Sequence, residues 1–103
     1  MYMKLIRDKI HELIEDKSRV FQLERMNDAS LVICLKDKLQ EETEEVQTAS
    51  DEELLEELAD VYEVITTMCV LSGHSIEDLL ECADTKRRAK GGFYDRWFLN
   101  EEE

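Results

Sequence analysis

Carboxylate side chains gather in two neighbouring stretches near the middle of the sequence. The residues concerned are Glu41, Glu42, Glu44, Glu45, Glu56, Glu57 and Asp60. Ligation by oxygen alone is what Mg²⁺ prefers, with Mn²⁺ as a common substitute. Glutamate runs also decorate solvated helix surfaces. The pattern therefore leaves two interpretations, a divalent metal site or a charged surface, and the helices that carry these residues must decide between them.

Glu42 conflicts with the pattern of its own helix. A helix is expected over residues 29–48, with the apolar stripe Leu31, Val32, Leu35, Leu39 and Val46. At about 100° per residue, Glu42 falls in this stripe, within roughly 20° of Leu35. Glu45 lies on the flank of the stripe, and Glu44 points to the opposite side. Because burial of an unpaired carboxylate is costly, Glu42 must be exposed, protonated, paired or bound to a metal.

The next helix, expected over residues 51–72, brings a second pair of carboxylates to an apolar edge. Glu57 and Asp60 are three residues apart and share a helical face. A short turn at residues 47–51 makes the two helices antiparallel. Glu42 and Glu45 should then face Glu57 and Asp60, so that four carboxylates share one volume. The sequence has no Glu-x-x-His pair, which argues against a carboxylate–histidine di-iron site.

The rest of the chain predicts an all-α fold. Further helices are expected over residues 3–16 and 76–89, and residues 19–24 are compatible with a short extended segment. We therefore expect one domain over residues 1–103, an antiparallel bundle of about four helices that is oligomeric, since so short a chain buries a modest core. An aromatic cluster near the C-terminus should pack on the bundle or on a second subunit: Phe93, Tyr94, Trp97 and Phe98.

Charge and composition narrow the class of partner. The net charge is −13, and residues 26–85 hold seventeen acidic residues against two basic ones. This argues against a nucleic-acid duplex, which needs a basic face. No apolar run is long enough for a membrane span, and no signal peptide is evident at the N-terminus. Three dispersed cysteines suggest buried thiols in a reducing compartment. A cytoplasmic location is therefore expected.

Four blocks of the sequence together resemble a known family. Glu41-Glu42-x-x-Glu45, followed after eleven residues by Glu57-x-x-Asp60, is similar to the signature of the MazG-like all-α nucleoside triphosphate pyrophosphohydrolases. The blocks KLIRDKIHELIE, KLQEETEE, EELADVYEVI and RRAKGGFYDR occur in the order found in the phosphoribosyl-ATP pyrophosphohydrolase-like branch. The resemblance spans nearly the whole chain.

This resemblance implies an enzyme and assigns its residues. The reaction would be Mg²⁺-dependent hydrolysis of a nucleoside triphosphate (NTP or dNTP) to the monophosphate and pyrophosphate, often to remove unwanted nucleotides. The implied assembly is a homodimer or homotetramer. The metal ligands carried over by position are Glu42, Glu45, Glu57 and Asp60. Glu41 and Glu45 are the catalytic candidates. Glu41 would either lie behind the metal ligands or help to orient water, and a spare carboxylate near the metal can act as general base.

Basic residues provide candidates for holding the phosphates. These are Lys38, Lys86, Arg87 and Lys90. The last three lie at a helix C-terminus, where cations also favour the helix dipole. In the N-terminal block, Arg7 or Lys9 either folds over a bound phosphate or belongs to a solvated face.

Two alternatives to the enzyme stay open at this stage. One is a non-catalytic acidic helical oligomer that binds nucleotide or a partner protein. The other is a purely structural helical protein whose carboxylates are solvated. The residues also leave open which nucleotide is cleaved, which phosphorus is attacked, and whether the assembly is a dimer or a tetramer.

Overall fold

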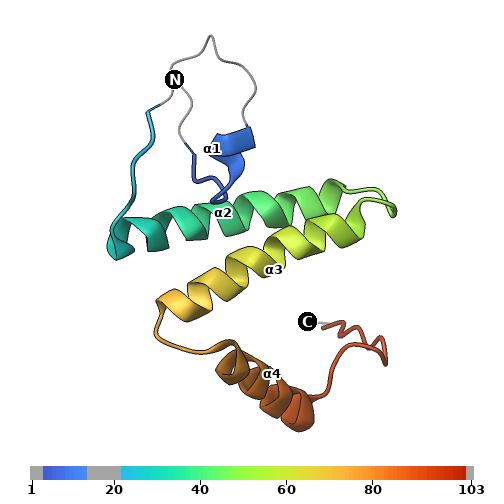
Figure 1. Cartoon of the computed structure of the whole chain (residues 1–103). Coiled ribbons are helices and arrows are strands. Elements are labelled where there is room, and N and C mark those ends of the chain that lie inside the picture. Colours follow the sequence, from blue (N-terminus) through green and yellow to red (C-terminus); the bar gives the residue numbers. More distant parts are fainter. Residues whose placement is uncertain (1–3, 14–21, 102–103) are drawn as a thin grey trace.

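The computed structural model describes residues 4–13 and 22–101, and every regular element in these residues is a helix. The helices are α1 (Ile10–Leu13), α2 (Asp28–Thr48), α3 (Leu54–Leu71) and α4 (Ile76–Lys90) (Figure 1). The expected all-α bundle of about four helices is confirmed. No strand forms at residues 22–24, and the remainder of the suggested extended segment lies outside the described residues.

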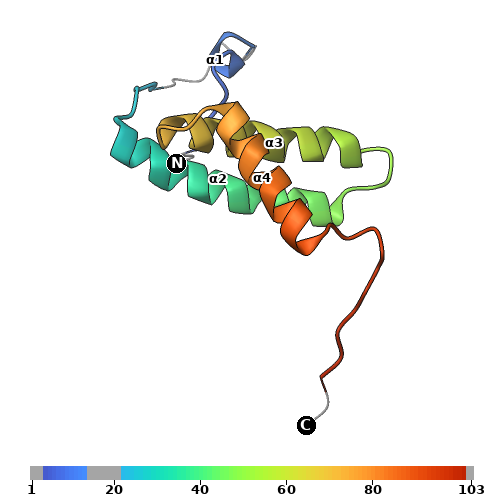
Figure 2. The same cartoon turned by 90° about the horizontal axis from the view of Figure 1, so that it is seen from below.

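Helices α2 and α3 form an antiparallel hairpin that carries the core. They run side by side, joined by a short turn (Figures 1 and 2). Leu35 from α2 and Val64 from α3 are the buried hydrophobic residues of the described chain. The hairpin is therefore the rigid platform on which any site between these two helices is built.

Side-chain hydrogen bonds lie at or just before the start of each hairpin helix; α2 has a side-chain N-cap, whereas α3 has none. Asn27 is the N-cap of α2, and its Oδ1 accepts a hydrogen bond of 2.8 Å from the Ser30 backbone N–H. In the turn, Ser50 Oγ accepts from the Glu53 N–H at 3.3 Å and donates to Glu53 Oε1 at 2.8 Å. These bonds hold residues 51–53 in a turn, so α3 begins at Leu54 rather than at Asp51 as expected.

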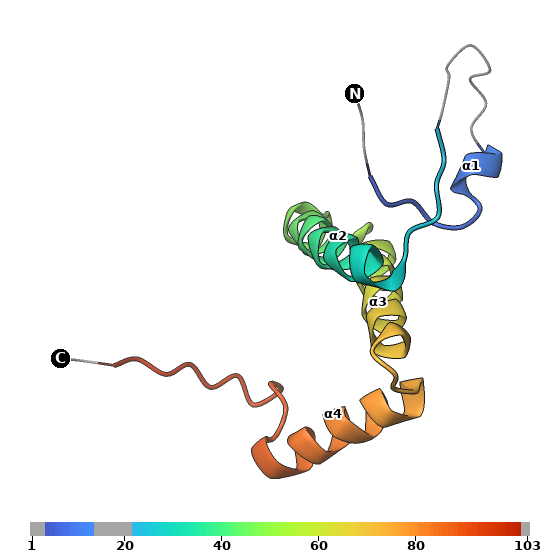
Figure 3. The ribbon, with the colours of Figure 1, turned by 90° about the vertical axis from the view of Figure 1, so that its left-hand side faces the viewer.

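Helix α4 leaves the hairpin at a sharp angle. Gly73, at φ 91°, provides the left-handed residue after α3, as its position predicts. Ser75 and Asp78 then form a capping box, and the hydrogen bonds from Ser75 lower the pKa of the Asp78 carboxyl. Among the described helices, α4 contacts α3 alone, and α3 lies between it and α2 (Figure 3).

The predicted N-terminal helix over residues 3–16 is wrong for residues 4–9. These residues are not helical, and α1 is a single turn. Leu5 and Ile6 are half-buried in the segment that crosses the hairpin before α1 (Figure 3). Their spacing fits a helix, but packing against the α2–α3 core outweighs this local preference. Residues 14–16 lie outside the described residues.

The described chain buries little on its own. Its radius of gyration is 18.1 Å, whereas a compact domain of this length has about 13 Å. Phe93, Tyr94 and Trp97 are 91–98 % exposed, so the prediction that the tail packs on its own bundle is wrong. Packing on a second subunit stays a prediction. Cys34 and Cys69 are half-buried, but Cys82 is exposed, contrary to expectation. No described helix combines the length and apolar character that crossing a membrane requires.

Candidate metal centre

Four carboxylates from the two hairpin helices converge on one volume. Glu42 and Glu45 come from α2, and Glu57 and Asp60 come from α3. Each offers one oxygen, and these oxygens all lie within 4.8 Å of one another. The three-residue spacing places each pair on one helical face, and the antiparallel hairpin turns the two faces toward each other. The structure thus brings together all four residues that the sequence selects as metal ligands.

Glu42 is the least solvated member of this cluster. Only 7 % of the residue is exposed, and its position seven residues after Leu35 explains why it points into the hairpin. Its Oε2 atom is buried and has no hydrogen-bond partner among the described residues, and the same holds for Glu57 Oε2. A buried carboxylate oxygen without a partner is costly. A divalent cation between the helices would satisfy one such oxygen from each, so the residues fit a metal.

The electrostatics of Glu42 support the same interpretation. Burial raises the pKa of its carboxyl, and the hydrogen bond and negative charge of Glu45 raise the pKa further. Lys38 opposes this effect, because its Nζ lies 3.4 Å from Glu42 Oε1. Without a cation, the ionised form of the Glu42 carboxyl is therefore disfavoured relative to a carboxyl in water. A bound divalent cation supplies the positive charge that reverses this preference.

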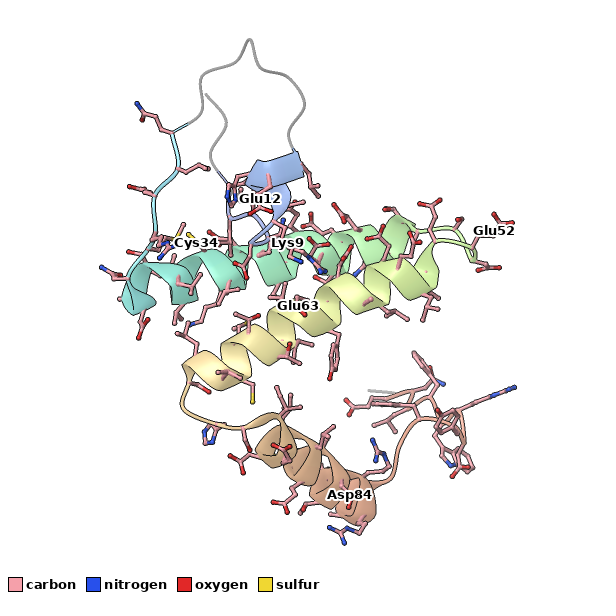
Figure 4. The ribbon with its side chains drawn as sticks, in the orientation of Figure 1. Lys9, Glu12, Cys34, Glu52, Glu63 and Asp84 are labelled. Carbon is pink, nitrogen blue, oxygen red and sulfur yellow. The ribbon has the colours of Figure 1, made fainter. Side chains whose placement is uncertain are left out.

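A cavity of about 190 Å³ lies beside the cluster. Its lining comes from the N-terminal segment, α2 and α3, and includes Arg7, Lys38, Glu42 and Asp60. Glu63, labelled on α3 in Figure 4, also lines it. The cavity provides space next to two of the four carboxylates, with a cation on either side. This is an arrangement suited to an anionic ligand that also contacts a metal.

Arg7 lies at the site, although the sequence left open whether Arg7 or Lys9 contacts phosphate or belongs to a solvated face. Its Nη2 atom lies 2.7 Å from Asp60 Oδ1, across 53 positions of the sequence. The spacing of charges in the N-terminal block carried no signal for this pair. The contact depends on residues 4–9 lying across the hairpin, which helical periodicity did not predict.

The other predicted site residues divide into near and distant groups. Lys38 lies at the cluster, and Glu41 Oε1 contacts Lys38 Nζ at 3.6 Å without joining the four converging oxygens. Lys86, Arg87 and Lys90 are exposed on α4 and do not line the cavity. Asp84, which pairs with Arg87 at 3.7 Å, marks this part of α4, away from the α2–α3 turn where Glu52 lies (Figure 4). Within one chain these three cations do not reach the carboxylates.

Comparison with known proteins gives one match. The family model for phosphoribosyl-ATP pyrophosphohydrolase matches residues 2–87. No curated protein and no solved structure matches the chain. The matched range contains all four converging carboxylates, Arg7 and Lys38, but it excludes Lys90 and the aromatic tail.

Proposed function

The chain belongs to the phosphoribosyl-ATP pyrophosphohydrolase family, and we propose that it is an Mg²⁺-dependent nucleoside triphosphate pyrophosphohydrolase that releases the monophosphate and pyrophosphate. Membership implies a hydrolase acting on the pyrophosphate bonds of a nucleotide. The observation that carries the proposal is the convergence of four carboxylates, among them a buried Glu42 with an unpartnered oxygen. The proposed role is removal of unwanted nucleotides from the cytoplasmic pool.

The proposed ligands of the ion are Glu42, Glu45, Glu57 and Asp60. Mg²⁺, or Mn²⁺ in its place, would neutralise charge on the phosphate oxygens and lower the pKa of a water molecule. Glu42 and Glu57 supply oxygens that are already desolvated and lack protein partners. The protein thus meets part of the cost of desolvating the ligands when it folds, and the binding of the ion recovers it.

The proposed general base is Glu45. It is the exposed member of the cluster, whereas Glu42 is buried and Glu57 and Asp60 are half-buried. Its carboxylate is therefore the most open to water, and it accepts the proton as the water oxygen bonds to phosphorus and the bridging P–O bond breaks. Lys38 is proposed to hold a phosphate oxygen. Glu41 keeps Lys38 in place through their 3.6 Å contact, in addition to its predicted role in orienting water.

A homo-oligomer, either dimer or tetramer, is part of the proposal. Helix α3 leaves large apolar side chains exposed, including Leu55 at 78 % and Tyr62 at 56 %. Together with the exposed aromatic tail, these surfaces need a partner to leave water. A second copy of the chain offers matching apolar surfaces. It is also the means by which Lys86, Arg87 and Lys90 would approach the carboxylates.

A substrate panel tests the enzymatic proposal. Purified protein is incubated with Mg²⁺ and ordinary or modified nucleoside triphosphates, with phosphoribosyl-ATP included, and released pyrophosphate is measured. Release from at least one nucleotide, abolished in the Glu42→Gln/Asp60→Asn double variant, is the expected result. Folded protein that binds a nucleotide in calorimetry but releases no pyrophosphate from any member would instead favour the non-catalytic binding protein.

A further inference from the structure

The ion pair between Arg7 and Asp60 contributes little to the stability of the fold, so a functional role is considered for it. Its two side chains are 55 % and 40 % exposed, and exposed ion pairs contribute little to folding. Yet the pair holds a guanidinium 2.7 Å from a carboxylate that belongs to the converging cluster. A cation in direct contact with a metal ligand competes with the metal for the same oxygens.

The N-terminal segment fixes the base of this arginine and leaves its tip accessible. Leu5 and Ile6 are half-buried and line the cavity together with Leu35 and Val64, the core residues of the hairpin. Arg7 follows directly, so its backbone is anchored over the hairpin while its side chain remains more than half exposed. A long side chain with a fixed base can exchange partners within its own reach without movement of the helices.

Two cations thus contact the carboxylate cluster, one from the non-helical N-terminal segment and one from α2. Arg7 contacts Asp60 of α3, and Lys38 contacts Glu42 of α2 at 3.4 Å. Both line the same cavity. An arginine is always charged, and its planar fork of donors matches two oxygens of a phosphate. The pair of cations beside a metal site is therefore suited to a diphosphate group, whose oxygens reach both the ion and the side chains.

We propose that Arg7 exchanges partners during substrate binding, from the Asp60 carboxylate in the metal-free protein to a phosphate oxygen of the bound nucleotide. This inference rests on the proposed function. When a divalent ion takes Asp60, repulsion between the ion and the guanidinium weakens the pair. The released guanidinium then binds the phosphate. Arg7 consequently opposes metal binding in the absence of nucleotide and favours the complex that contains both, so ion and nucleotide bind cooperatively.

Two binding measurements test the exchange without relying on turnover. Free Mn²⁺ is titrated into metal-free protein, and inorganic pyrophosphate is titrated by calorimetry in saturating Mg²⁺. For Arg7→Ala we expect Mn²⁺ affinity tighter than that of wild type, and pyrophosphate affinity lower by about tenfold or more. Arg7→Lys should lose less, because it retains the charge but not the fork. Lys36→Ala, at an exposed cation of α2 that does not line the cavity, is the matched control and should change neither affinity.

Each other outcome overturns the assignment. Unchanged pyrophosphate affinity in Arg7→Ala would mean that the guanidinium does not reach phosphate. Weaker Mn²⁺ binding in the folded variants Arg7→Ala and Arg7→Lys would mean that Arg7 only orients Asp60. An equal loss of pyrophosphate affinity in Lys36→Ala would mean that the effect comes from overall charge alone. The proposed function fails separately: wild type would release no pyrophosphate from any nucleotide, whatever the Arg7 variants bind. Conversely, an active wild type with unaltered Arg7→Ala affinities would remove only this inference.

Discussion

The α2–α3 hairpin and the region formed by α4 and the C-terminal tail differ in how far a single chain buries their side chains. In the hairpin, Leu35 and Val64 are buried and the carboxylates converge. In the second region the described residues include no buried side chain, and Trp97 is 91 % exposed. The hairpin is therefore a site that one chain can build. The second region leaves its large apolar side chains exposed in the single chain.

The two regions also lack different kinds of interaction partner. In the hairpin, the unsatisfied groups are buried oxygens of Glu42 and Glu57, which the proposed cation would satisfy. In the second region they are exposed apolar rings, which require another apolar surface. A single ion would satisfy the two buried carboxylate oxygens, whereas the exposed rings would need a large apolar surface to cover them. Substitutions in the two regions should accordingly change different properties of the protein.

The largest expected effect comes from removing a single charge in the hairpin. Glu42→Gln, or Asp60→Asn, should lower kcat/KM by roughly 10³-fold or more, because each takes a ligand from the metal. Circular dichroism should show unchanged helicity. Glu44→Gln is the matched control on the same helix, since Glu44 is exposed and outside the cluster, and it should retain activity. A fully active Glu42→Gln/Asp60→Asn protein would remove these residues from the mechanism.

The exposed apolar surface of α3, which we propose meets a second chain together with the aromatic tail, should instead respond in the association state of the protein. Sedimentation of wild type should give a dimer or tetramer, and Leu55→Asp should shift the protein toward monomer, because a charge on this apolar surface cannot be buried without cost. Glu56→Lys, on the exposed, polar side of α3, is the control for altered charge and should leave the assembly intact. A wild-type protein that sediments as a stable monomer at all concentrations would contradict the assignment of this surface.

A smaller effect is expected on the stability of the metal-free hairpin. The pKa of Glu42 is raised in the folded protein, so the folded state holds this proton more tightly than the unfolded state. That stabilisation is present below the ordinary pKa of 4.5 and is lost as pH rises through the folded pKa. With chelator present, the Tm of wild type should fall below that of Glu42→Gln as the pH rises through this range. Parallel Tm curves for the two proteins would contradict the burial argument.

Much of the hairpin was predictable from the sequence because local and tertiary signals agree there. The stripe that contains Leu35, the short turn at residues 47–51 and the three-residue spacing of Glu57 and Asp60 all indicate the same antiparallel pair. Glu42 was informative because it broke this agreement, as residues with a functional role often do. The convergence of the four carboxylates followed from helix geometry and a short turn.

The sequence failed where the position of a segment depends on contacts far along the chain. Leu5 and Ile6 fit a helical period, but they pack on α2 and α3 in a non-helical segment. The contact of Arg7 with Asp60 spans 53 positions, and local periodicity carries no information on such pairs. The predicted packing of the aromatic tail on its own bundle was wrong for a related reason. The residue pattern indicates that the rings should be buried, but it does not indicate which surface would bury them.

The most direct test of the account is a calorimetric titration of Mn²⁺ into metal-free protein. We expect saturable Mn²⁺ binding by wild type and by Glu44→Gln, and loss of Mn²⁺ binding in Glu42→Gln and Asp60→Asn. At 100 times Kd the bound ion should also stabilise the folded wild type by about 2.7 kcal/mol. Equal Mn²⁺ affinity in wild type and Glu42→Gln would contradict the central claim that these carboxylates form a metal site.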